Sequence, residues 1–135
     1  MPVTTGFNHV ATMTADMDRI VDFYEQAFGA IKTFEMAARP DHPRMTILDL
    51  GGGAALNVLE VAPDEIIGDR RRSGGRGPID HYAIAVDTLA TLEAVRDRLE
   101  ALGTDLGQIQ QLGDSWSLFF RDPDGMELEV CAPAG

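Results

Sequence analysis

Hydrophobic and polar residues along the first half of the chain follow a strand, a helix and three more strands. Residues 6–13 alternate weakly, which predicts a short strand. A helix is predicted next, capped by Thr14 or Asp16 and ended by Gly29. Its apolar positions recur at helical spacing and are Met17, Ile20, Val21, Tyr24 and Phe28. Proline- and glycine-rich turns then separate three predicted strands, at residues 31–37, 44–50 and 54–61.

The same pattern restarts in the second half. A strand is predicted at residues 81–86, and a helix at residues 91–102 that Gly103 ends. Three strands follow at residues 106–111, 115–121 and 126–132, the last two joined by the tight turn Asp122-Pro123-Asp124-Gly125. The pattern predicts an α+β domain of two tandem β-α-β-β-β modules with roughly eight strands. We place module one at about 5–62, a linker at about 63–78 and module two at about 79–133 of a single domain.

The two modules align at an offset of 72 residues. His9 then corresponds to His81, and Asn57 corresponds to Glu129. Because side chains alternate between the faces of a strand, these four residues are predicted to lie on the face opposite the apolar set that covers the helices. They would line a concave face of each sheet.

Two histidines and one carboxylate form a ligand set that suits Fe(II), Mn(II), Zn(II) or Ni(II) with open positions for a substrate. His9, His81 and Glu129 are therefore candidate metal ligands. The alternative is that each histidine is a hydrogen-bonded structural residue, because no short ligand motif joins the three positions.

Composition narrows the possible partners. The chain has 135 residues, of which 44% are hydrophobic, and 22 acidic residues against 11 basic ones give a net charge of −11. This charge argues against nucleic acid as a partner. No apolar run of membrane length and no signal segment are present, and the only cysteine is Cys131. We expect a cytoplasmic protein with no membrane partner.

The residues that carry a family resemblance span nearly the whole chain. They are His9, the helix end Asp22-Phe23-Tyr24 with Phe28-Gly29, His81, and the run from Phe120 to Glu129 with its Asp-Pro-Asp-Gly turn. This pattern resembles the vicinal oxygen chelate superfamily, which includes glyoxalase I, bleomycin-resistance proteins, extradiol dioxygenases, fosfomycin-resistance transferases and methylmalonyl-CoA epimerase. The resemblance implies curved mixed sheets around a cavity and a homodimer. It also implies metal ligands at His9, Asn57, His81 and Glu129, with each site formed within one chain or across two.

The sequence departs from the glyoxalase pattern at Asn57, where Glu or Gln is the family's residue. An amide cannot accept a proton at neutral pH, so Asn57 cannot be a general base, and Glu129 is the remaining candidate catalytic residue. Classical glyoxalase I activity is therefore disfavoured. Fosfomycin transferases carry a tyrosine and a serine before the turn, and this chain matches only the serine, at Ser117, with Phe119 in the tyrosine's place.

The strand before the turn is predicted to line the cavity. Its candidate substrate-binding residues are Trp116, Ser117, Phe119 and Arg121. Core packing is an equal alternative for Trp116, and support of the following turn is an alternative for Arg121. The arginine-rich part of the predicted linker is residues 70–76. We interpret it as a solvated connection in preference to the alternative, a site that binds an anionic substrate.

Taken with the resemblance, these residues predict a metal-dependent enzyme. One divalent ion (Fe, Mn, Ni, Zn or Co) would bind a small substrate through vicinal oxygens, in a lyase, isomerase or dioxygenase reaction. One alternative is a metal-free protein that sequesters a small aromatic or cationic molecule, as bleomycin-resistance proteins do. Another is a sensor or immunity module.

Overall fold

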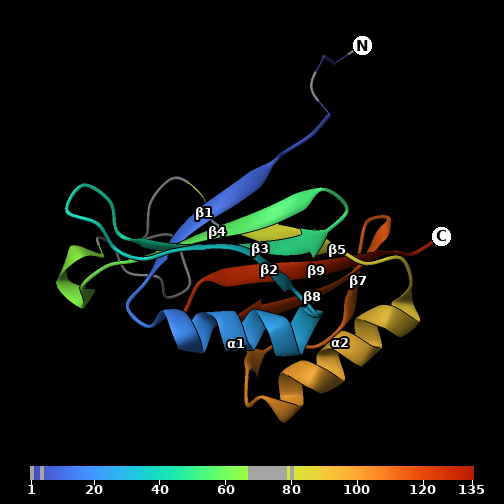
Figure 1. The fold of residues 1–135 in the computed structure, drawn as a ribbon. Helices are drawn as coiled ribbons and strands as arrows, with labels where there is room; N and C mark the ends of the chain where they lie inside the picture. Colours follow the sequence, from blue (N-terminus) through green and yellow to red (C-terminus); the bar gives the residue numbers. More distant parts are fainter. Residues whose placement is uncertain (1, 4, 67–78, 80) are drawn as a thin grey trace. The chain divides into compact units, whose positions relative to one another are not determined.

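The computed structural model describes residues 2–3, 5–66, 79 and 81–135, which fall into two compact units, Met1–Ile67 and Gly68–Gly135 (Figure 1). The first unit contains β1 (His9–Thr14), α1 (Met17–Phe28), β2 (Ile31–Met36), β3 (Arg44–Gly51), β4 (Ala54–Glu60) and a short 3-10 helix, η1 (Pro63–Glu65). The second contains β5 (Tyr82–Ala85), α2 (Leu89–Ala101), β6 (Asp105–Leu106), β7 (Gln110–Leu112), β8 (Ser115–Arg121) and β9 (Glu127–Pro133). The predicted α+β class and the tandem modules are confirmed. Residues 67–78 of the predicted linker, including its arginines, lie outside the described residues.

Each unit has one mixed sheet. The strand order is β1-β4-β3-β2 in the first unit and β5-β9-β8-β6 in the second, where β7 also pairs with β8. The pairs β1–β4 and β5–β9 are parallel, and the other pairs are antiparallel. The first and last strands of each module are therefore neighbours, although the rest of the module separates them in the sequence.

The 72-residue repeat is present in the strand register. Ala11 lies opposite Asn57 in β1–β4, and the residues 72 positions later, Ala83 and Glu129, lie opposite each other in β5–β9. On the other side of the last strand, Ile47 faces Asn57 as Phe119 faces Glu129. Asn57 and Glu129 thus occupy the same place in two copies of one scaffold.

The core of each unit lies between its sheet and its helix. The fully buried apolar strand residues are at even positions, and they are Leu48, Leu56 and Val58 in the first unit and Leu118, Leu128 and Val130 in the second. In α1, the Asp16 side chain accepts a hydrogen bond from the Arg19 amide at the N-terminus, and Gly29 ends the helix with a φ of 67°. The even positions face the helix because a strand alternates its side chains. The odd positions, which include His9, Asn57 and Glu129, face the other way.

The predicted strand at residues 106–111 is wrong as a single strand. Leu106 lies opposite Phe120, whereas Gln110 lies opposite Ser117, so β6 and β7 are separated by a shift of one residue in their pairing with β8. One extra residue on one side of an antiparallel pair is a β-bulge, which interrupts the ladder and bends the strand. The hydrophobic pattern of six residues does not record such an insertion.

The predicted turn before β9 is confirmed. The Gly125 amide donates to the Asp122 carbonyl at 2.8 Å, and the buried Asp122 carboxylate accepts hydrogen bonds from the amides of Asp124 and Met126. These bonds fix the start of β9 and therefore the place of Glu129. None of the helices among the described residues has the length and apolar character needed to cross a membrane.

Candidate metal and substrate site

The second unit brings three of the predicted site residues together around Glu129. His81 Nε2 lies 3.2 Å from Glu129 Oε1, and the Ser117 hydroxyl donates to Glu129 Oε2 at 2.5 Å. The His81 side chain is 31% exposed and the Glu129 side chain is 14% exposed. His81 directly precedes β5, Ser117 lies on β8, and Glu129 lies on β9, so the pairing of three strands builds this cluster.

Glu129 is held in its anionic form. Burial acts to raise the pKa of its carboxyl group, but hydrogen bonding by Ser117, Cys131 and His81, together with the charge of His81, outweighs burial and lowers the pKa below its ordinary value. A lowered pKa keeps the carboxylate ionised at neutral pH and makes it a weak proton acceptor.

The distance between His81 and Glu129 fits two ligands of one ion. Donor atoms that each lie about 2.0–2.2 Å from a metal, at angles of about 90–110°, are separated by about 3–3.5 Å. The 3.2 Å between His81 Nε2 and Glu129 Oε1 lies within that range. Imidazole nitrogen and carboxylate oxygen are also the donor types that Mn, Fe, Co, Ni and Zn accept.

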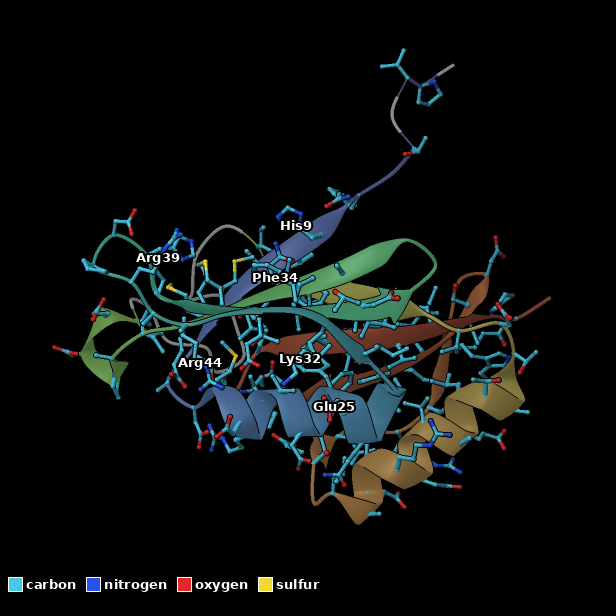
Figure 2. The ribbon with its side chains drawn as sticks, viewed as in Figure 1. His9, Glu25, Lys32, Phe34, Arg39 and Arg44 are labelled. Atoms are coloured by element: carbon cyan, nitrogen blue, oxygen red, sulfur yellow. The ribbon has the colours of Figure 1, made fainter. Side chains whose placement is uncertain are left out.

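The first unit holds the other two predicted ligands. His9 is exposed on β1, where its Nδ1 atom lies 2.8 Å from the Asn8 side-chain oxygen (Figure 2). This contact leaves Nε2 of His9 as the nitrogen directed away from Asn8. Asn57 is half-buried on β4. Among the described residues, no three His, Cys, Asp or Glu side chains are grouped closely enough to hold a metal ion by themselves.

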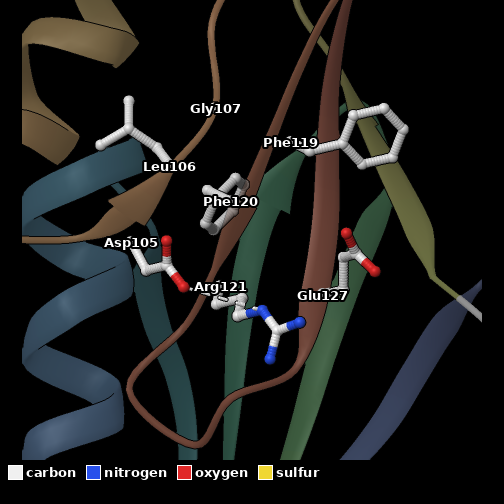
Figure 3. Close-up of a pocket in the computed structure, with 7 residues that line it drawn as sticks. All are labelled: Asp105, Leu106, Gly107, Phe119, Phe120, Arg121 and Glu127. Carbon is white, nitrogen blue, oxygen red and sulfur yellow. Dashed lines mark ion pairs between the residues drawn. The ribbon is translucent and has the colours of Figure 1, made fainter. Parts of the chain in front are cut away.

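Phe119 connects the cluster with a pocket in the second unit. Its ring meets the His81 ring edge to face, with centroids 5.2 Å apart. This pocket has a volume of about 240 Å³, and Figure 3 shows the residues that line it. It is lined by Asp105, Leu106, Gly107, Phe119, Phe120, Arg121 and Glu127.

The pocket places one cation beside two carboxyl groups. Arg121 Nε lies 3.8 Å from Asp105 Oδ2, and Glu127, which is 5% exposed, lies opposite Arg121 in the β8–β9 pairing. Asp105, Leu106 and Gly107 were not among the sequence candidates, because the pairing with β8 that brings this segment beside Arg121 is not encoded in the local pattern. Glu127 was also missed as a pocket residue. It could have been found from the sequence, because residues two apart on a strand share a face and Glu127 therefore shares that of Glu129.

Trp116 lies away from this cluster. It is half-buried, opposite Ala132 in the β8–β9 pairing, and shares its strand face with Leu118 and Phe120. That face is the one that packs toward the helix of the unit. A substrate-binding role for Trp116 stays a prediction.

Cys131 is expected to be an unreactive thiol at neutral pH. Burial, with the hydrogen bonding and negative charge of Glu129, raises the pKa of Cys131 to about 11. At pH 8, native protein should therefore react with a disulfide reagent such as DTNB on the order of 100-fold more slowly than an ordinary cysteine. Unfolded protein at the same pH is the control, and equal rates in the two states would contradict the prediction. The same shift has a consequence for stability: the contribution of the protonated thiol is complete below pH 9 and is lost as the pH rises toward 11.

Comparison with known proteins extends these observations. The family model described as the glyoxalase/bleomycin resistance protein/dioxygenase superfamily matches residues 6–130. Metallothiol transferase FosB of Shouchella clausii (strain KSM-K16) is 31% identical over 131 residues, which cover 95% of this chain and 80% of that protein. A protein named as a putative ring-cleaving dioxygenase, MhqA of Bacillus subtilis (strain 168), is 26% identical over 127 residues, but the match spans only 40% of its length.

Solved structures share the fold at lower identity. A glyoxylase/bleomycin resistance protein/dioxygenase domain from Frankia sp. EAN1pec has a TM-score of 0.80 at 24% identity, with 96% of this chain and 98% of that chain covered. A mutant form of the fosfomycin resistance protein FosX of Listeria monocytogenes, in complex with Mn(II) and a dihydroxypropylphosphonic acid, has a TM-score of 0.70 at 16% identity, with 98% of this chain and 92% of that chain covered.

Proposed function

Because the chain belongs to the glyoxalase/bleomycin resistance protein/dioxygenase superfamily, we propose that it is a divalent-metal-dependent enzyme acting on a small substrate that chelates the ion through vicinal oxygens. The observation that carries this proposal is the His81–Glu129 pair, whose donor atoms are 3.2 Å apart. His9 would supply a third ligand, and Asn57 would be a weak fourth ligand or a hydrogen-bonding group. When bound, the ion would act as a Lewis acid that polarises a substrate oxygen.

The chain's own residues favour reactions that need no strong protein base. Asn57 cannot take a proton at neutral pH, and both carboxylate oxygens of Glu129 already have partners, His81 Nε2 beside Oε1 and the Ser117 hydroxyl on Oε2. Isomerisation next to a carbonyl requires a base and is disfavoured. We favour the addition of an external nucleophile to a polarised substrate, the class to which the name of the FosB relative belongs, or an oxygenase reaction.

The pocket beside Phe119 supports a neutral or cationic substrate with an apolar part. Among the described residues that line it, Arg121 is the one cation, and Asp105 and Glu127 offset its charge. A phosphonate dianion would meet two carboxylates there and would find no tyrosine hydroxyl at Phe119. The net charge of −11 also disfavours a dianion. The substrate is therefore proposed to differ from fosfomycin.

Titration of divalent metal into the purified protein tests the proposal. Native protein should bind close to one equivalent of at least one of Mn, Fe, Co, Ni or Zn per site. Asn57→Glu should tighten binding about tenfold or more, because it adds an anionic ligand at the position equivalent to Glu129. The matched control is Gln111→Glu, which makes the same change of charge at an exposed position on β7.

Two different failures are distinguishable in this experiment. Native protein that ignores all five metals would remove the enzyme proposal and favour the alternative, a metal-free protein that sequesters a small molecule. Equal dissociation constants for native protein and Asn57→Glu would exclude residue 57 from the site while leaving the metal proposal in place.

A further inference from the structure

The two carboxylate oxygens of Glu129 have different partners. Oε1 lies beside His81 Nε2, while Oε2 accepts the hydrogen bond from the Ser117 hydroxyl. Ser117 is fully buried, with 0% exposure. A serine hydroxyl carries a single proton, so a hydroxyl that donates to Glu129 has none left to donate to a substrate.

The repeat provides a comparison within the same chain. The strand register places Met45 of the first unit where the second unit has Ser117, and Leu59 where it has Cys131. Asn57 lies two residues before Leu59 on β4, and Glu129 lies two residues before Cys131 on β9, so each of the two is a diagonal neighbour of Met45 or Ser117 on the adjacent strand. The unit with the neutral amide thus has two apolar neighbours, and the unit with the carboxylate has two neighbours that carry O–H or S–H groups. The hydrogen-bond donors Ser117 and Cys131 therefore occur only in the unit that carries the charged Glu129.

We propose that Ser117 is a positioning residue, which holds one oxygen of Glu129 so that the other is presented beside His81 as a single-oxygen metal ligand. The inference rests on the proposed function. A carboxylate can bind a metal through one oxygen or both, and a hydrogen bond to one of them removes that freedom. The bond also fixes the rotation of the carboxylate, which is what a ligand set drawn from separate strands needs for a defined geometry.

The test compares metal binding by native protein with three variants on β8. Ser117→Ala should bind Mn(II) about 10- to 100-fold more weakly, because loss of a group that orients a ligand has effects of this size. The EPR spectrum of bound Mn(II) should also change, since the free carboxylate can turn and use both oxygens. Ser117→Thr, which keeps the hydroxyl, should restore most of the affinity and the native spectrum. The control is Ser115→Ala, which removes a half-buried hydroxyl two residues earlier on the same strand face and should change neither.

Each other result overturns the inference. Native affinity and spectrum in Ser117→Ala would mean that the hydroxyl does not position the ligand. Equal weakening in Ser117→Thr and Ser117→Ala would mean that packing, and not the hydroxyl, causes the loss of affinity. Equal weakening in Ser115→Ala would mean that any substitution that perturbs β8 weakens binding. If native protein binds no metal, the proposed function fails as well. If Ser117→Ala does not fold, the isosteric Ser117→Cys replaces it, with a smaller loss expected because a thiol is a weaker donor.

Discussion

Replacing His81 with alanine should weaken binding of divalent metal by at least about 100-fold, because it removes a nitrogen that lies beside the carboxylate of the proposed pair. The remaining ligand types, His9 and Glu129, belong to different units and include only one nitrogen donor. The measurement is the dissociation constant for Mn(II) or Zn(II), obtained by competition with a chelator of known affinity.

His42→Ala is the matched control for His81→Ala. His42 lies in the first unit, where its Nδ1 atom is 2.7 Å from the Pro43 carbonyl oxygen, and its removal should leave metal affinity within about twofold of native. Unchanged affinity in His81→Ala would show that the contact with Glu129 is a structural hydrogen bond. Equal weakening in both variants would indicate a metal bound by surface histidines in general.

Leu128→Ala should lower the free energy of unfolding by about 3–4 kcal/mol, because it leaves a cavity in a core that is closed on all sides. Leu128 is 0% exposed and lies on β9 between Tyr82 of β5 and Phe120 of β8. Denaturant unfolding of native and variant protein measures the change.

The control for Leu128→Ala is the same substitution at Leu112, which is 47% exposed on β7 of the same unit. It should cost less than about 1 kcal/mol. A similarly small loss of stability in Leu128→Ala would contradict the prediction. It would mean that the neighbouring side chains close the space left by the leucine, so that no cavity remains.

Much of the fold could be predicted from local patterns. Helical spacing predicted α1 up to Phe28 and Gly29, with Thr14 or Asp16 as its cap, and the structure has Asp16 there. Caps and periodicity are predictable because they depend on neighbouring residues. The faces of the strands were predictable for the same reason, and they put Asn57 and Glu129 opposite the buried positions. The 72-residue offset supplied the one long-range relation, the equivalence of the two modules.

The rest depends on contacts that periodicity does not encode. The bulge that separates β6 from β7 is defined by its pairing with β8, and the pocket beside Phe119 follows from that irregular edge. The hydrogen bond between Ser117 and Glu129 joins side chains on two neighbouring strands. Which side chains meet across a strand pair depends on the register of the pair, and the hydrophobic pattern of one strand does not contain it. The homodimer, and the joining of His9 with His81 in one site, stay predictions.

The common register of the two sheets means that each of these strand positions has an equivalent position in the other unit of the same chain. A doubled scaffold keeps one half available to maintain the architecture while the other half changes its chemistry. Here the half with Met45, Asn57 and Leu59 is neutral at these positions, and the half with Ser117, Glu129 and Cys131 carries one carboxylate with a hydroxyl and a thiol beside it. Residues can therefore be exchanged between the two units by mutation, since each of these positions has a structurally matched counterpart in the same molecule.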